Sequence, residues 1–490
     1  MSRSDAERLL PTLPVGGRSL ERRVLHARCL KNLESFDIAW AELNTLLAQV
    51  RDPLLAARVA IDLIHLAYYL VRGDEMRRLL RIAERQAATD PLLLAELRLG
   101  ESINATAANE ITKALRDARW ADDALSAAPR GRSRDLVATR VSRQLAHVLS
   151  HAGDHAAARA AAEATARNAA RVGDAWEIAW ATYTAGFVEW MAGSNERAVE
   201  EFTKAEAGLR SYGSSVWRYT LFCLARAKME RGELAEGDRL ARQSATGAPE
   251  DLAHLALLRG EAEVAERILE RAPKGLPADE HFRDVVRGIV AAHRGDPRRG
   301  VRMLDEGAME LESRGMEYWA LGIALHAAFW REKLVRGAGA ARATQLVREL
   351  ASTGAQGFAY YLPEVGVWAG RVAERAGVAV KTARTLRAAG EAAARRAESD
   401  AAIPVGASPL DEVTFHLRTL GLTWRELGIL RELEQLRGST AHVPRDVLAA
   451  RLGVTPNTLR VHLTRIRAKL DVGDRRGDDV LLEAALRRSA

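Results

Sequence analysis

The side chains best suited to chemistry lie near the C-terminus, in the stretch 456–470, for which we predict an amphipathic helix. This stretch holds four Lys or Arg residues and no Asp or Glu. Projected at about 100° per residue, its apolar residues fall on one narrow stripe, which we expect to pack inward: Leu459, Leu463, Ile466 and Leu470. The other faces are polar and basic, as suits contact with a polyanion such as DNA.

The polar faces of this predicted helix divide into a central strip and two flanks. Amide, hydroxyl and guanidinium groups read base edges, and small apolar groups contact thymine methyl groups. We therefore predict base contacts from the central strip, which holds Asn457, Val461, Thr464 and Arg465. The flanks suit phosphate contacts, which orient a protein on the duplex, and hold Thr458, Arg460, Arg467 and Lys469. The alternative is a basic helix that is merely solvated.

The residues before this helix are typical of a second helix and a tight turn. Pro444 can begin a helix, and its apolar side would hold Val447, Leu448, Ala449 and Leu452. Gly453 supplies a permissive backbone for the turn, and Val454 is expected in the core. Thr455 followed by Pro456 reads as an N-cap with proline at the first helical position. Together they predict a helix-turn-helix.

The region around this motif resembles the LuxR-type DNA-binding domains. The resemblance lies in Leu-Thr-Trp-Arg-Glu-Leu at 422–427, in Ile429-Leu430, and in the segments 455–462 and 466–472. It implies a domain of four helices, in which 480–486 is the fourth helix and makes a dimer contact. Large regulators of that family place a helical repeat array before this domain. They commonly carry an N-terminal NTPase as well, for which we find no motif.

One segment departs from the LuxR pattern. Between Leu436 and Val447 the chain is longer than that family usually allows, with 437–445 inserted. This segment, and Arg465 to Leu470, are closer to the OmpR-type winged helices. The C-terminal Gly-Tyr wing of that group is missing, since the residues after Gly473 return to a helical pattern. We favour the LuxR-like form of four helices.

Upstream of residue 400 the sequence is organised by recurring turn glycines. Most intervals after Gly153 are near forty residues, and Gly73 precedes Gly153 by two such units; the others are Gly193, Gly232, Gly260, Gly295, Gly337 and Gly377. This period is typical of a solenoid of helix hairpins. The unit 179–210 resembles the tetratricopeptide pattern, with Gly186 on its first helix and Ala198, Phe202 and Ala205 on its second.

Two features of this array have competing interpretations. The segment 371–383 also has the pattern of a DNA-reading turn, but Gly377 falls on the repeat rhythm, so a terminal hairpin is preferred. A concave array surface usually binds a peptide, protein or small effector. The tryptophans would be ligand candidates if exposed, but a core role is favoured for them: Trp176, Trp180, Trp190, Trp217, Trp319, Trp330 and Trp368.

Catalytic and metal-binding motifs are absent from the sequence. There is no Walker-type loop, H-E-x-x-H or G-x-S-x-G, so we expect neither an enzyme nor a cofactor. His151 and His155 have the spacing of helical zinc ligands, but Gly153 between them matches the repeat turns, so no metal is expected. Cys29 and Cys223 are far apart and read as small buried hydrophobes.

Composition sets the class of protein. Ala, Leu and Arg dominate, aromatic residues make up 5%, and the formal net charge is +7. We expect an all-α, cytoplasmic protein, because neither a signal-peptide core nor a long apolar run is present.

The predicted architecture is a tetratricopeptide-like helical solenoid over 1–398, a linker over 399–407 and a LuxR-like helix-turn-helix domain over 408–490. The favoured function is a transcriptional regulator that binds double-stranded DNA as a homodimer under the control of an effector. The alternative is an interaction scaffold whose C-terminal helices do not bind DNA.

Overall fold

The computed structural model confirms an all-α chain. Its described residues form α-helices and two short 3-10 turns, with no strand among them. The structure describes all residues except 14–18, 71–74, 245, 273–276, 378–379, 401–421, 423, 438–443, 453–455, 473–478 and 488–490. No helix within the described ranges is long and apolar enough to cross a membrane.

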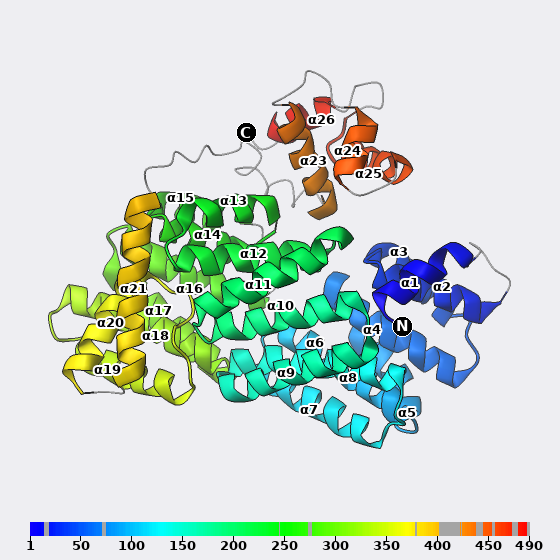
Figure 1. Cartoon of the computed structure of the whole chain (residues 1–490), viewed down its shortest axis with the longest axis horizontal. Helices are drawn as coiled ribbons and strands as arrows, with labels where there is room; N and C mark the ends of the chain where they lie inside the picture. Colours follow the sequence, from blue (N-terminus) through cyan, green and yellow to red (C-terminus); the bar gives the residue numbers. More distant parts are fainter. Residues whose placement is uncertain are drawn as a thin grey trace. The chain divides into compact units, whose positions relative to one another are not determined.

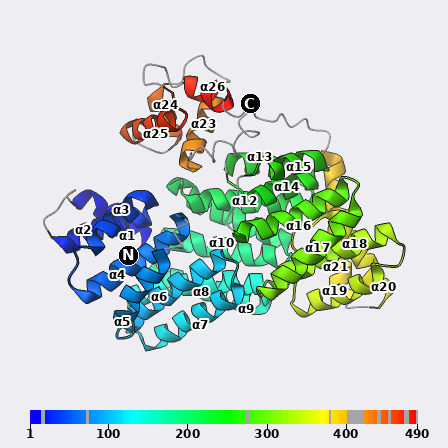
Figure 2. The same ribbon diagram turned by 180° about the vertical axis from the view of Figure 1, so that it is seen from behind.

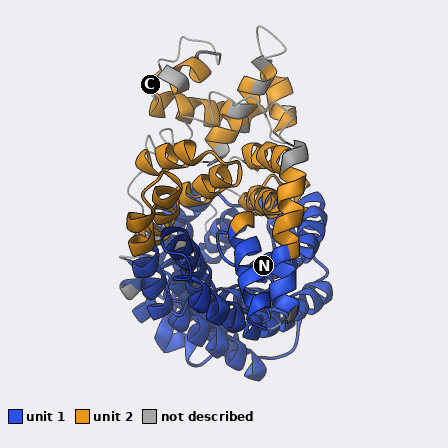
Figure 3. Ribbon diagram, turned by 90° about the vertical axis from the view of Figure 1, so that its left-hand side faces the viewer, with its two compact units in different colours: residues 1–208, 304–361, 365–387 blue, residues 209–303, 362–364, 388–490 orange. Residues whose placement is uncertain are grey.

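The chain forms two compact units (Figure 3). Unit 1 comprises Met1–Gly208, Leu304–Tyr361 and Val365–Arg387, and unit 2 comprises Leu209–Met303, Leu362–Glu364 and Ala388–Ala490. Four of the described helices, α11, α17, α20 and α21, have residues in both units. Of the linker predicted over 399–407, the first two residues belong to α21, and 401–407 lie outside the described residues.

Unit 1 is built mainly of antiparallel helix pairs, as the repeat rhythm predicts (Figures 1 and 2). Neighbours in the chain pack together, most extensively α8 with α9 and α6 with α7. The helices of its first segment are α1 (Arg3–Leu9), η1 (Leu10–Thr12), α2 (Leu20–Asn32), α3 (Phe36–Leu47), α4 (Pro53–Leu70), α5 (Met76–Ala87), α6 (Pro91–Ala107), α7 (Ile111–Ala127), α8 (Arg132–Ala152), α9 (His155–Val172), α10 (Ala175–Met191) and α11 (Asn195–Leu209). The later helices are α17 (Pro297–Ser313), α18 (Glu317–Leu334), α19 (Ala340–Ser352), α20 (Pro363–Arg375) and α21 (Val380–Asp400).

Unit 2 continues the helical pairs and then carries the C-terminal helices. In its first part α12 pairs with α13, and α14 pairs with α15. The helices there are η3 (Arg210–Tyr212), α12 (Ser215–Glu230), α13 (Leu234–Ser244), α14 (Pro249–Leu258), α15 (Ala262–Glu270) and α16 (Pro277–His293). The C-terminal helices are α23 (Trp424–Arg437), α24 (Arg445–Arg451), α25 (Pro456–Lys469) and α26 (Asp479–Arg487).

The turn glycines have the backbone that the repeat pattern requires. Gly153, Gly193, Gly232, Gly260, Gly295, Gly337 and Gly377 all have positive φ, between 69° and 97°. Gly73 lies outside the described residues. The sequence rhythm missed a second set, in which positive φ recurs at the turns between hairpins: Gly173, Gly213, Gly315 and Gly354. Glycine therefore follows both helices in four described hairpins: α8–α9, α10–α11, α16–α17 and α18–α19.

Small residues allow the two helices of the tetratricopeptide-like hairpin to approach. A Cβ on Gly186 of α10 would lie 2.7 Å from the ring of Phe202 on α11. Ala198, Phe202 and Ala205 are fully buried. The positions predicted for these four residues on the two helices of this hairpin are confirmed.

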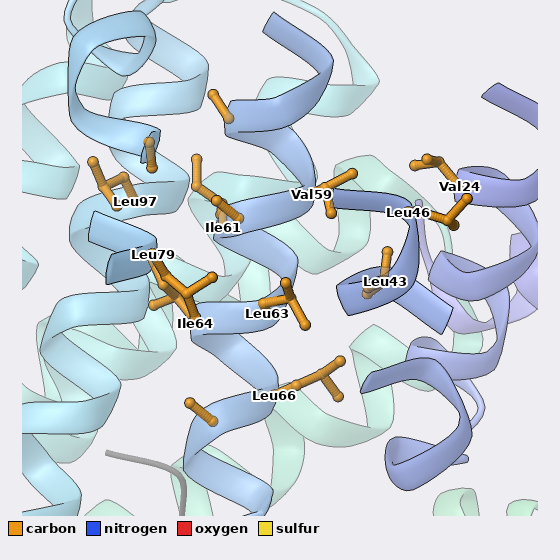
Figure 4. Close-up of a cluster of buried hydrophobic side chains, with 14 of the residues drawn as sticks. Val24, Leu43, Leu46, Val59, Ile61, Leu63, Ile64, Leu66, Leu79 and Leu97 are labelled. Atoms are coloured by element: carbon orange, nitrogen blue, oxygen red, sulfur yellow. The ribbon is translucent and has the colours of Figure 1, made fainter. Parts of the chain in front are cut away.

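Branched aliphatic residues fill the core at the N-terminal end of unit 1. The cluster joins α2, α3, α4, α5 and α6 (Figure 4). Val24, Leu43, Leu63, Leu79 and Leu97 are each at most 4% exposed. At about 25 cal/mol per Å² of apolar surface, such burial is the main stabilising contribution to this end.

Unit 1 also contains contacts between helices far apart in the sequence. Helix α18 packs on α8, and the turn after α10 meets the turn after α19. The backbone N–H of Gln356 donates to the carbonyl oxygen of Ala192 at 2.6 Å. A Cβ on Gly193 would overlap the backbone of Gly357. The helices of unit 1 are therefore joined through their turns as well as in sequence order.

The glycine contact gives a matched pair of substitutions. Gly193→Ala should destabilise the protein by about 2–4 kcal/mol, because a strained positive φ adds to an overlap with Gly357. Gly173→Ala should cost only about 1 kcal/mol, because its φ of 68° is similar but nothing lies within 4 Å of the added Cβ. Urea denaturation measures both. Equal losses in the two variants would show that the turn contact contributes nothing.

Candidate nucleic-acid interface

The C-terminal helices share one apolar core. Leucine and isoleucine side chains from α23, α24, α25 and α26 form it, together with Leu422. The stripe predicted for the basic helix lies inside, because Leu459, Leu463, Ile466 and Leu470 are at most 1% exposed. The inward orientation of this stripe is confirmed, so the polar faces of α25 point away from the core.

The helix before α25 differs in one respect from the sequence prediction. Leu448 and Ala449 of α24 are buried, as expected, and Leu452 is half-buried. Val447 is 42% exposed, so it was wrongly placed on the apolar side. Helix α24 has only seven residues, so its buried side is limited to little more than one turn. Helix α25 begins at Pro456 as predicted, and the turn residues 453–455 lie outside the described residues.

The central strip of α25 is exposed. Asn457, Val461, Thr464 and Arg465 all lie on the surface. Arg460 is also exposed, and its Nη2 donates to Asn457 Oδ1 at 2.9 Å. This hydrogen bond holds a guanidinium and an amide side by side. Base and phosphate contacts from these residues stay predictions, for which the required exposure is present.

The other predicted phosphate contacts are placed differently. Arg467 is buried, with 8% of its surface exposed. Lys469 donates from Nζ to Glu426 Oε2 of α23 at 2.7 Å, and the Glu426 side chain is 1% exposed. The side chain of Thr458 lies outside the described residues. Arg467 and Lys469 therefore serve the packing of this four-helix region, and the outward cations of α25 are Arg460 and Arg465.

The choice between a LuxR-like and a winged form depends on two segments. Helix α26, Asp479–Arg487, occupies the position of the predicted fourth helix and packs on α23. No strand occurs in the described part of 422–487. The inserted segment falls mainly on 438–443, outside the described residues. The LuxR-like form therefore remains a prediction.

The seven tryptophans of the array are core residues. Trp176, Trp190 and Trp319 are at most 8% exposed, and the other four are half-buried. The interpretation of these residues as core is confirmed. Two of these rings, both in unit 1, also make cation–π contacts. The guanidinium carbon of Arg143 lies 3.6 Å from the centroid of the Trp180 ring, and that of Arg3 lies 4.6 Å from the centroid of the Trp176 ring.

The histidines considered as metal ligands have other neighbours. The indole N–H of Trp319 donates to His151 Nδ1 at 2.8 Å, so that nitrogen carries no proton. His151 Nε2 then carries it and donates to His147 Nε2 at 3.2 Å. His155 lies edge-on to Tyr318. This arrangement links α8 to α18, and it assigns the protonated Nε2 of His151 to a hydrogen bond rather than to a ligand position.

Sequence reasoning missed a cluster of charged residues inside unit 1. It contains Arg28, Lys31, Asp62, Arg140, Arg143 and Glu177. A local signal exists for the two acids, since Asp62 stands among Ala60, Ile61 and Leu63, and Glu177 follows Trp176. A carboxylate on an otherwise apolar helix face requires buried partners.

Comparisons with known proteins do not place the chain in a family. No protein-family model matches it, and no curated protein matches its sequence. Its fold is similar to that of a Rap protein complexed with competence and sporulation factor, at 14% identity and TM-score 0.37, over 69% of this chain and 100% of that one. It is also similar to a Rap conjugation gene regulator of plasmid pLS20 in complex with the Phr* peptide, at 11% identity and TM-score 0.34, over 83% and 100%. With TM-scores below 0.5, the functional argument rests on the chain's own residues.

The ion pair in the C-terminal helices predicts a loss of stability. Lys469→Met should loosen these helices by about 1–3 kcal/mol, because it removes one of the groups that neutralise buried Glu426. Amide hydrogen exchange across α23 and α25 measures this. Arg465→Ala is the matched control and should leave exchange unchanged, since Arg465 is exposed. Adding Glu426→Gln to Lys469→Met should restore most of the protection; a double variant as loose as Lys469→Met would contradict the pairing.

The buried histidines predict an acid-sensitive unit 1. Burial lowers the pKa of His147 to about 4 and lowers the pKa of His151 well below its ordinary value. Between about pH 6.5 and pH 4 the unfolded chain binds the proton and the folded chain does not, so stability falls as pH falls. His147→Gln should flatten this slope by about 1.4 kcal/mol per pH unit. Urea unfolding at pH 8, 6 and 5 tests it, and parallel slopes for wild type and variant would refute it.

Proposed function

We propose that the chain is a cytoplasmic, non-enzymatic transcriptional regulator that binds double-stranded DNA through α25 and responds to an effector through its helical array. The observation that carries this proposal is the outer face of α25. That face presents Asn457, Arg460, Val461, Thr464 and Arg465 while the opposite stripe is buried. Amide, hydroxyl, methyl and guanidinium groups on one exposed face are the set that reads base edges in a major groove.

The supporting observation is that α25 is packed on its buried side against neighbouring helices. Helices α23 and α24 pack against α25, and α23 also holds α26. Lys469 adds a charged contact from α25 to α23. A helix with side chains is about 10–12 Å in diameter, which fits a major groove about 12 Å wide, and the 14 residues of α25 give a length of about 21 Å along it. Such a helix enters the groove as a rigid element with its side chains already oriented.

A homodimer is part of the proposal. One helix-turn-helix reads a short half-site, and dimers that bind two half-sites about one helical turn apart gain affinity and specificity. Helix α26 is the candidate contact, from the LuxR resemblance. A two-fold protein predicts a palindromic DNA site.

The competing function is a scaffold whose C-terminal helices bind another protein. Val447 and Val461 support it, since both are more than 40% exposed in the same four-helix region. A protein-docking face would need apolar contact at these positions, whereas a DNA face would place only Val461 in the groove. Substituting Val447 by Ser should therefore leave DNA binding unchanged under the regulator proposal.

Salt dependence separates the two functions. Fluorescence anisotropy with random duplex DNA should show affinity falling steeply with salt, with a slope in log–log form of about −0.9 for each phosphate neutralised. Micromolar or weaker binding that does not respond to salt would favour the scaffold. The same titration with duplexes selected from a random pool then gives the specificity ratio.

Arg465→Ala tests the reading face directly. It should lower discrimination between selected and random duplexes by about 1–3 kcal/mol, because a guanidinium that contacts a base edge is lost. Arg348→Ala is the matched control, since it removes an exposed arginine from α19 and changes the net charge equally. If both variants discriminate between selected and random duplexes as well as the wild type does, the proposal that Arg465 of α25 contacts bases is wrong.

A further inference from the structure

Four basic side chains of unit 1 gather on two helices that are far apart in the sequence. Arg28 and Lys31 lie on α2 and share Asp62 of α4, with Arg28 Nε 2.8 Å from Asp62 Oδ2. Arg140 and Arg143 lie on α8 and share Glu177 of α10, at 3.5 Å and 3.1 Å. We call the four basic residues the cationic site.

The cationic site is partly buried and has more positive than negative charge. The side chains of Asp62 and Glu177 are 4% and 1% exposed, and those of the four cations are between 12% and 27% exposed. Glu96 of α6 adds a third carboxylate that acts on Arg28. Burial and the charge of Arg140 lower the pKa of the Met1 α-amino group to about 5, so this group adds no charge at neutral pH. Four cations thus face three carboxylates, which leaves one positive charge uncompensated where water screens poorly.

The pKa values of two neighbouring side chains are lowered, as an excess of positive charge requires. Burial and the charge of Lys31 lower the pKa of His65 to about 3, with a further contribution from Arg140. Burial also lowers the pKa of Lys31, and Arg28 and Arg140 lower it further while Asp62 opposes them. The two halves meet at Met1, whose carbonyl oxygen accepts from Arg140 of α8 and whose sulfur lies 3.7 Å from the Sγ of Cys29, the neighbour of Arg28 on α2.

The N-terminal end of helix α1 contacts the cationic site in this structure. Arg140 Nη2 donates to the carbonyl oxygen of Met1 at 3.1 Å, and Ser2 and Ala6 are fully buried. Asp5 caps the helix with Ser2 and accepts from exposed Arg132 at 2.7 Å. Helix α1 packs on both α2 and α10. A neutral carbonyl oxygen thus occupies a position where a carboxylate oxygen would bind a guanidinium more strongly.

We propose that the cationic site binds a carboxylate-bearing ligand in place of the first residues of α1, and that this ligand is the effector of the array. A single carboxylate balances the surplus of one positive charge, whereas a phosphate monoester, with a charge near −2, would leave a negative excess. Guanidinium groups suit this ligand because they bind carboxylates in a bidentate manner. The regulatory role of this ligand rests on the proposed function, whereas binding of a carboxylate at the cationic site does not.

Thermal unfolding of the full chain tests the site. The probes are N-acetyl-pentaalanine with a free carboxylate and sodium butyrate, each at 20 mM, against the pentaalanine amide and NaCl at equal ionic strength. We expect the carboxylate probes to raise Tm by about 2 °C or more. A larger rise with the peptide would assign a peptide C-terminus, and a larger rise with butyrate a small organic acid. No rise with either probe would overturn the proposal.

Variants assign the response to the named residues. Arg140→Gln and Lys31→Met should each abolish the rise in Tm, whereas Arg159→Gln should keep it. Arg159 is the matched control because it makes an ion pair of the same kind, at 2.9 Å, with Glu189, which lies at the other end of α10 from Glu177. Should Arg140→Gln fail to fold, Asp5→Asn provides a second test outside the site. It weakens the cap of α1 and should raise the response at least twofold, and a smaller response than wild type would overturn replacement of α1.

Two readouts separate this proposal from the proposed function. Carboxylate probes should speed amide exchange in α1, and slower exchange there would contradict replacement. DNA anisotropy with the same protein is independent of both results. DNA binding without carboxylate binding would refute the site alone, and carboxylate binding without DNA binding would refute the regulator alone.

Discussion

The architecture of unit 1 depends on backbones that approach each other closely at glycine. A helix hairpin with a short turn favours a residue at positive φ, and Gly153, Gly193 and their counterparts supply it at the turns of unit 1 from Gly153 onward. Where Gly193 meets Gly357, the lack of two side chains lets turns far apart in sequence come into contact. Helix α18 can then lie on α8, and the indole of Trp319 can reach His151. The polar interior of unit 1 exists because this framework holds its helices in place.

Local patterns in the sequence predicted what depends on local physics. Turn glycines, the hairpin positions of Gly186 and Phe202 and the buried stripe from Leu459 to Leu470 follow from period and residue size alone. The pairing of Lys469 with Glu426 could not be predicted in this way, because it depends on which helix lies opposite. Val447 was misplaced for a related reason, since a helix of seven residues has too few turns to define a face. The cationic site was missed because its residues are spread from 28 to 143, and each alone resembles an ordinary surface charge.

The basic residues of α25 differ in whether they are exposed or covered by a neighbouring helix. Arg460 and Arg465 extend from the face opposite the leucine stripe, where water solvates them until a partner replaces it. Arg467 and Lys469 lie near the end that α23 covers, and Glu426 compensates Lys469 there. A helical projection places Arg465 opposite the stripe and Arg460, Arg467 and Lys469 on its flanks, but it does not show how far the neighbouring helix reaches along the axis. The number of basic residues on a helix is therefore a poor measure of its affinity for DNA, and the exposed subset is the relevant quantity.

The chain thus holds two kinds of cation with different physics. The guanidinium groups on α25 are exposed, so their attraction for phosphates is screened over a Debye length of about 8 Å at physiological ionic strength. The cations of unit 1 are largely buried, and salt screens buried charges much less. Interactions at the first set should weaken as salt rises, while those at the second should persist. An effector held by buried charges would therefore keep its occupancy under ionic conditions that release the protein from DNA, so a signal bound by the array need not be lost when DNA contact is lost.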